Sequence, residues 1–220
     1  KVAYVLHTQP VDNNGTDLPA VVGEICPDLN IIFSTNKLSN QHLNYLYNIA
    51  DVTINIASNE GFGLGTCESL MCGTPIIVNV TGGMQDQCGF EYKGKHLDYT
   101  DYSWVESLHD WRKWENNEDL THGEWVKPVW PKTRTLAGSP PTPYIFDDRA
   151  DWVEVADKIE YWYDMDKEQR DECGFKGHEW VCGDEAMMSA RAMCGLFIDH
   201  MGVALDKWTP RKRFELMEVK

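Results

Sequence analysis

The sequence predicts an α/β protein built around a doubly wound parallel sheet. Short β-prone apolar runs alternate along the chain with segments whose apolar residues recur at helical spacing. This alternation favours parallel strands joined by crossover helices. A glycine-rich turn at residues 58–65 lies between two of the apolar runs, and doubly wound sheets bind ligands at such turns, beyond the carboxyl ends of the strands. We therefore expect a ligand site along that edge of the sheet.

The composition is typical of a globular protein with an acidic surface. The 220 residues are enough to bury a core, 42% of them are hydrophobic, and the formal net charge is −15. This charge argues against nucleic acid as a partner, because nucleic acid binds basic surfaces. No apolar run approaches the ~20 residues of a membrane span. Seven cysteines without a CxxC pair fit neither a disulfide framework nor a zinc module, so we expect a cytoplasmic protein.

Strands and helices alternate through the first part of the chain. A helix is expected to start near Asp17, and Ser39 can cap a second helix whose residues Leu43, Leu46 and Ala50 have helical spacing. A third helix follows the glycine-rich turn. The expected strands are residues 2–7, 30–34, 52–56 and 76–80.

The glycine-rich turn has the features of an anion site. The helix after it is expected to start near Gly65 and to stop at Gly73, because glycine commonly follows a helix end and Pro75 cannot continue one. Gly61 and Gly63 leave the turn without side-chain bulk, so backbone N–H groups and the positive helix end can approach a ligand closely. A phosphate would fit there.

Two carboxylates flank this turn. Glu60 precedes it, and Glu68 is expected in the first helical turn, eight positions later. A carboxylate can accept two hydrogen bonds from a vicinal diol, so a phosphate with sugars on both sides, a nucleoside diphosphate sugar, is the suggested ligand. The alternative is that Glu68 complements the helix dipole and Glu60 is a solvated loop residue.

The pattern changes after residue 90, where the chain becomes rich in tryptophan, proline and charge. We expect a loop at residues 138–143 and the last strand of the sheet at Tyr144-Ile145-Phe146. Helices are then expected to begin at Asp147 or Asp151, near Lys167 and near Asp184.

Three motifs in this order resemble a known family. They are Glu60-Gly61-Phe62-Gly63 followed by Glu68, then Gly73-Thr74-Pro75-Ile76-Ile77, and then Thr81-Gly82-Gly83 with Met84-Gln85-Asp86-Gln87. The pattern is similar to the donor-binding half of retaining GT-B glycosyltransferases, particularly family 4, over residues 30–88. The resemblance implies a Rossmann-like domain equivalent to the C-terminal half of a GT-B enzyme, with the first βα unit missing ahead of Lys1.

The resemblance also implies a role for each matched residue. Glu60 is the expected catalytic residue, facing hydroxyls of the transferred sugar, and Glu68 is expected to take the ribose diol. The expected contacts of sugar and phosphate are Gly61, Phe62, Gly63, Leu64, Gly82 and Gly83. The expected contacts of the nucleotide are Glu68, Ser34, Thr35, Lys37 and Leu38.

The implied reaction moves a sugar from a nucleoside diphosphate to an acceptor hydroxyl. No cofactor or metal is expected, because a helix dipole and basic side chains stabilise the leaving diphosphate. The expected partners are the nucleotide sugar, an acceptor of unidentified chemistry and a missing N-terminal GT-B domain. The Arg and Lys that family members carry ahead of a strand like residues 2–7 have no match, so we expect the isolated fragment to be inactive. The alternatives are a nucleotide-sugar 2-epimerase and a non-catalytic nucleotide-sugar binding module.

The resemblance finally suggests how the domain is organised. We expect a donor-binding domain at residues 1–202 and a C-terminal tail at 203–220. Residues 90–143 exceed the family's usual link, so we interpret them as an insertion on the ligand edge. We expect its tryptophans to pack against their own domain in preference to stacking on an acceptor sugar; they are Trp104, Trp111, Trp114, Trp125 and Trp130.

Overall fold

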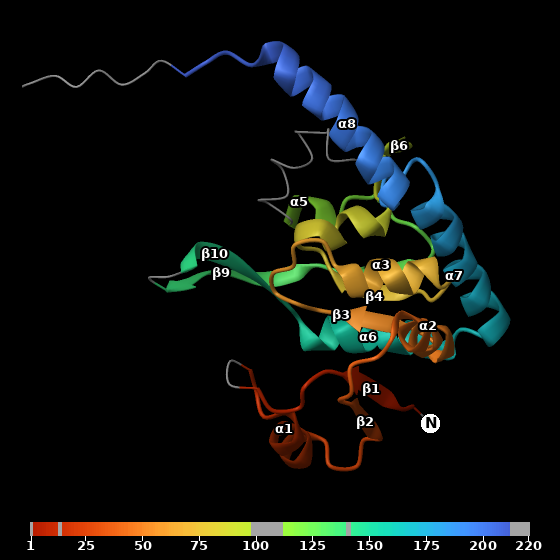
Figure 1. Cartoon of the computed structure of the whole chain (residues 1–220). Coiled ribbons are helices and arrows are strands. Elements are labelled where there is room, and N and C mark those ends of the chain that lie inside the picture. The colour runs from red at the N-terminus through yellow and green to blue at the C-terminus, as the bar shows by residue number, and fades with distance from the viewer. Residues whose placement is uncertain (1, 13–14, 98–111, 140–141, 212–220) are drawn as a thin grey trace, which may run out of the picture. The chain divides into compact units, whose positions relative to one another are not determined.

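The computed structural model describes residues 2–12, 15–97, 112–139 and 142–211, which belong to two compact units, 1–43 and 44–220 (Figure 1). In the first unit, β1 (Tyr4–His7) pairs in parallel with β2 (Ile31–Ser34). Helix α1 (Leu18–Ile25) connects them, and the Asp17 carboxylate caps it by accepting a hydrogen bond from the Ala20 amide at 3.0 Å. The expected β-α-β order of this segment is confirmed.

The second unit is built on three parallel strands. They are β3 (Thr53–Asn55), β4 (Ile76–Asn79) and β8 (Val126–Val129), with β4 in the middle. All four residues of β4 are buried. Helix α2 (Asn40–Ile49) precedes β3, and α3 (Leu64–Met71) connects β3 to β4. The expected parallel α/β architecture is therefore confirmed.

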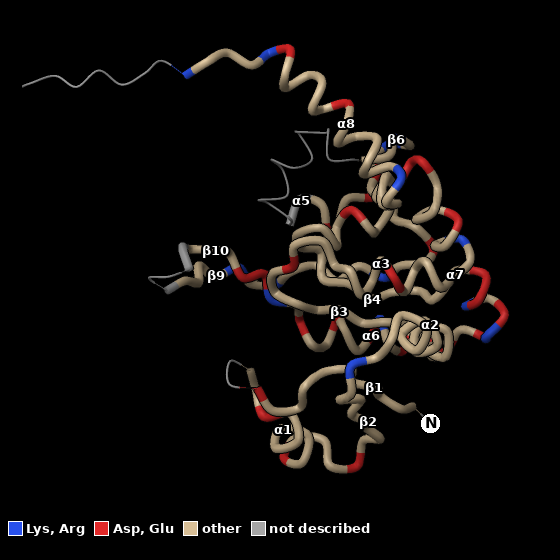
Figure 2. Tube along the Cα trace, in the orientation of Figure 1, with Lys and Arg blue, Asp and Glu red and all other residues tan. Residues whose placement is uncertain are grey.

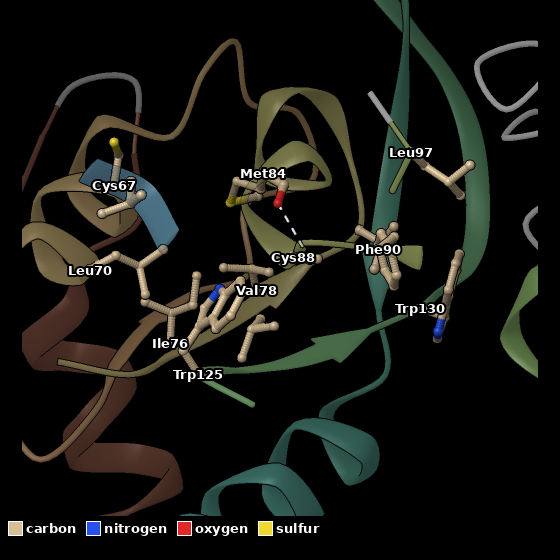
Figure 3. Close-up of a cluster of buried hydrophobic side chains, with 13 residues drawn as sticks. Cys67, Leu70, Ile76, Val78, Met84, Cys88, Phe90, Leu97, Trp125 and Trp130 are labelled. Atoms are coloured by element: carbon tan, nitrogen blue, oxygen red, sulfur yellow. Dashed lines mark hydrogen bonds between the residues drawn. The ribbon is translucent and has the colours of Figure 1, made fainter. Parts of the chain in front are cut away.

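Alternate residues of β4 face two different hydrophobic cores. Ile76 and Val78 pack with Leu70 of α3 and Val181 of α7 (Lys167–Cys182) in the larger core, part of which Figure 3 shows. Ile77 packs in the second core with residues of β8 and of α6 (Trp152–Asp164). Because side chains alternate along a strand, the sheet carries helices on both faces, as a doubly wound fold requires.

The expectation that residues 144–146 form the last strand of the parallel sheet is wrong. Residues 144–146 belong to β10 (Thr142–Ala150), which pairs antiparallel with β9 (Pro131–Ser139) in a separate hairpin, so most of the loop expected at 138–143 is also strand. The third sheet strand is β8, inside the stretch that we interpreted as an insertion. Pro128 lies within β8, and a proline argues against an interior strand. It is tolerated here because β8 is an edge strand and the missing N–H breaks no ladder bond.

Small elements connect β4 to β8. They are η1 (Gly82–Met84), η2 (Asp86–Cys88), β5 (Glu91–Tyr92), β6 (Lys95–His96), α5 (Arg112–Glu115) and β7 (Leu120–Thr121). Trp125 and Trp130 are buried, and Trp114 packs against the same core, which confirms the expected packing for these three. Trp104 and Trp111 lie outside the described residues.

The C-terminal helices begin at capped positions. Asp151, Asp166 and Ser189 each accept a hydrogen bond from an amide of the first turn of α6, α7 and α8 (Ala190–Lys207). Helix α8 buries none of its residues and continues past Gly202, where we expected a tail to begin. Among the described residues, no helix combines the length and the apolar character that crossing a membrane requires.

Gly174 of α7 gives a test of the packing between α7 and α3. A Cβ atom there would lie 1.9 Å from the carbonyl oxygen of Gly73, just after α3. Gly174→Ala is therefore expected to lower the free energy of unfolding, measured in urea, by about 1–3 kcal/mol. Gly195 of α8 has open space around it, so Gly195→Ala is expected to stabilise the helix by up to about 1 kcal/mol. Equal effects of the two substitutions would contradict the close α7 contact.

Candidate functional site

The glycine-rich turn leads into α3 as predicted. Gly63 precedes the helix with φ +83°, a left-handed conformation that side chains disfavour. A Cβ atom at Gly63 would also lie 2.8 Å from Cγ of Met84. Leu64 and Gly65 begin the helix, and the first amides of a helix have no acceptor within it. Glycine is thus required where the chain enters the helix, and the free amides are available to an anion.

The structure brings the glycine-rich turn and the Gly-Gly turn together. The Gly83 amide donates to the carbonyl oxygen of Gly61 at 3.0 Å. Gln87 is fully buried, and its Nε2 donates to the carbonyl oxygens of Phe62 at 2.7 Å and Gly63 at 3.0 Å. The two predicted sugar and phosphate segments are therefore locked into one rigid cradle. Gln87 was not among the predicted site residues.

Glu68 lies just past the first turn of α3, and not within that turn as we expected. The helix begins at Leu64 and has no acidic residue in its first turn, and the helix dipole acts mainly within that turn. The dipole alternative for Glu68 is weakened for this reason. The Tyr47 hydroxyl of α2 donates to Oε2 of Glu68 at 3.0 Å. Burial and this hydrogen bond raise the pKa of Tyr47, so the hydroxyl stays protonated and fixes the carboxylate.

Glu60 stands at the carboxyl end of β3. It is half-buried, and Nδ2 of Asn55 donates to its Oε2 at 3.5 Å. Asn55 is held in turn, because its Oδ1 accepts the Ala57 amide at 3.0 Å. A carboxylate has about four acceptor positions. This long contact, the one that Glu60 makes among the described residues, therefore leaves it able to accept sugar hydroxyls.

Asp148 of β10 links the hairpin to the cradle. The residue is buried, with 4% of its surface exposed. Its carboxylate accepts hydrogen bonds from Oγ1 of Thr81 at 3.0 Å and from Nη2 of Arg134 at 2.8 Å. Its amide donates to Ser58 O at 2.8 Å, and its carbonyl oxygen accepts from Asn79 Nδ2 at 2.7 Å. Asn79 and Thr81 precede Asp148 by 69 and 67 positions, so no local sequence signal indicated this contact.

The predicted nucleotide residues Ser34, Thr35, Lys37 and Leu38 lie in the first unit. Ser34 ends β2, and its Oγ lies 3.0 Å from Nδ1 of His7, which ends β1. Nε2 of Gln9 donates to the carbonyl oxygen of Thr35 at 3.2 Å. The structure thus groups these residues at the carboxyl ends of two parallel strands, and their contact with a nucleotide stays a prediction.

Comparison with known proteins supports this interpretation of the motifs. Residues 29–122 match the family described as glycosyl transferases group 1. Among curated protein sequences no significant match is found.

Two solved structures share the fold at low identity. Sucrose-phosphate synthase from Thermosynechococcus elongatus has a TM-score of 0.55 and 18% identity over 91% of this chain and 38% of its own. The catalytic domain of Starch Synthase IV from Arabidopsis thaliana, bound to ADP and acarbose, has a TM-score of 0.51 and 13% identity over 92% of this chain and 32% of its own. The chain therefore spans 38% and 32% of the two proteins. It shares their GT-B fold, and residues 29–122 are similar to the glycosyl transferases group 1 family.

Proposed function

We propose that this chain is the donor-binding part of a retaining glycosyltransferase, which transfers a sugar from a nucleoside diphosphate sugar to an acceptor hydroxyl. The observation that carries the proposal is the cradle of two hydrogen-bonded glycine turns at the start of α3, with Glu60 just before the first turn and Glu68 on the helix that follows it. An anion site alone needs no acid, whereas a diphosphate with a sugar at each end presents diols to both carboxylates.

The proposed arrangement assigns one task to each part of the cradle. The diphosphate lies at the start of α3, where unpaired amides and the positive helix end stabilise its charge. Glu68 accepts the ribose hydroxyls, and Glu60 accepts hydroxyls of the transferred sugar. Leaving-group charge is stabilised in this way without a metal ion. The ADP bound to Starch Synthase IV supports a nucleotide at this fold.

The whole enzyme in this proposal is larger than the domain. The chain spans 38% and 32% of the two structural neighbours, which supports a second domain that completes the site. That domain supplies the remaining acceptor contacts and the cationic groups for the diphosphate. A cytoplasmic location is part of the same proposal.

Glu60→Gln tests whether this carboxylate recognises the sugar. The substitution keeps the shape and removes the charge, so the affinity for a nucleotide sugar is expected to fall by about 1.5–3 kcal/mol. The affinity for the bare nucleotide is expected to change little, because Glu60 is placed away from the diphosphate and ribose. Calorimetric titration with UDP, GDP, ADP and their sugars measures both. Equal losses of affinity for the nucleotide sugar and for the bare nucleotide would count against this role.

A further inference from the structure

The hairpin of β9 and β10 carries an exposed apolar surface. Leu136 is 58% exposed and Phe146 is 52% exposed. Figure 2 shows that the charged residues of the hairpin gather at its base, and the described residues 135–139 and 142–146 contain none. Neighbouring exposed apolar side chains of this kind can form a contact surface for a ligand or a protein.

Phe146 and Leu136 lie on the same face of the hairpin as its ion pair. The register pairs Phe146 with Leu136 and Asp148 with Arg134. The Arg134 guanidinium lies over the Phe146 ring, 5.6 Å from its centroid. Ile145 pairs with Ala137 and, because side chains alternate along a strand, projects from the opposite face. The face with Phe146, Leu136 and Arg134 is called the hairpin platform below.

The base of the platform is fixed to the cradle. Asn59, the residue before Glu60, donates from Nδ2 to the carbonyl oxygen of Phe146 at 3.2 Å. The carboxylate of Asp148, on the platform face, accepts from Oγ1 of Thr81, the residue before the Gly-Gly turn. The strand that carries Phe146 is therefore hydrogen-bonded to both segments proposed to hold the donor sugar.

We propose that the hairpin platform binds the acceptor as a carbohydrate ring, with the ring's apolar face on Phe146 and Leu136. A pyranose has an apolar face and hydroxyls around its edge. The platform offers Phe146 and Leu136 for the apolar face, and the guanidinium of Arg134, which lies over the Phe146 ring, as a hydrogen-bond donor for the hydroxyls. Its place beside the cradle favours the acceptor over an unrelated partner. The inference rests on the proposed function, because only a bound donor makes this neighbour an acceptor.

The test compares two substitutions on adjacent residues of one strand. Phe146→Ser alters the platform, and Ile145→Ser alters the opposite face of the hairpin at a side chain that is 41% exposed. Saturation-transfer NMR measures binding of maltotetraose, cellotetraose, sucrose and acarbose, with UDP, GDP or ADP present. At least one saccharide is expected to bind the unmodified chain and the Ile145→Ser variant with the same affinity. The same saccharide is expected to bind the Phe146→Ser variant about tenfold more weakly. Leu136→Ser is also expected to weaken binding of that saccharide.

Other outcomes would overturn the platform. One is that none of the four saccharides binds. Another is that Phe146→Ser and Ile145→Ser lose saccharide affinity equally. The third is a dimer in analytical ultracentrifugation that only Phe146→Ser dissociates, which would assign the face to a second copy of the chain. Nucleotide affinity is measured on the same samples and is expected to be unchanged in all three variants. Nucleotide binding without saccharide binding would refute the platform alone, whereas saccharide binding without nucleotide binding would refute the donor site.

Discussion

Replacing Gly82 with alanine is expected to destabilise the protein and to abolish tight binding of a nucleotide sugar. A Cβ atom at position 82 would lie 1.7 Å from the carbonyl oxygen of Glu60, and Gly82 has φ +51°. The side chain therefore adds left-handed strain and forces the two turns apart. Together these effects are expected to lower the free energy of unfolding by roughly 2–4 kcal/mol, as measured by urea denaturation.

Gly61→Ala is the matched control in the facing turn. No atom lies within 4 Å of a Cβ built at Gly61, so its free energy of unfolding is expected to stay within about 0.5 kcal/mol of the unmodified chain. A Gly82→Ala protein as stable as Gly61→Ala would show that the two turns are not in contact.

Replacing Glu68 with alanine is expected to weaken binding of a nucleoside diphosphate by roughly 1.5–3 kcal/mol, the scale of hydrogen bonds to a charged group. Tyr47 already fixes the carboxylate through Oε2 at 3.0 Å, so the ribose meets a positioned acceptor. Isothermal titration calorimetry measures the loss.

Glu68→Gln separates charge from position in the same experiment. The amide oxygen can still accept a ribose hydroxyl, so the loss is expected to be smaller than in Glu68→Ala. Unchanged affinity in a folded Glu68→Ala protein would remove Glu68 from the nucleotide site.

Local sequence signals predicted the part of the fold that carries the cradle. The turn around Gly63 and the end of α3 at Gly73 follow from backbone preferences of glycine and proline, which act within a few residues. The run of β4 was equally readable, because buried parallel strands are mostly apolar. The strand β3 was readable from its alternation of apolar and polar β-prone residues. The cradle itself depends on these local features and on two turns that follow neighbouring strands.

The parts that the sequence did not predict depend on distant contacts. Pro128 argued against a strand at β8, because a proline is unfavourable in an interior strand. The structure shows that β8 is an edge strand, which tolerates it. Residues 144–146 have the composition of a sheet strand, yet they pair with β9 in a hairpin. The roles of Asp148 and Gln87 arise from partners far along the chain, and no spacing rule connects such residues.

The location of nucleotide binding is the most direct test of the account. Backbone amide NMR during titration with UDP, GDP and ADP reports which residues contact the ligand. The account predicts that the largest shift changes for at least one nucleotide fall on residues 61–66, with smaller changes at Gly82 and Gly83. Binding that leaves these amides unchanged and shifts residues elsewhere in the chain, or no binding by any of the three nucleotides, would contradict the proposed donor site.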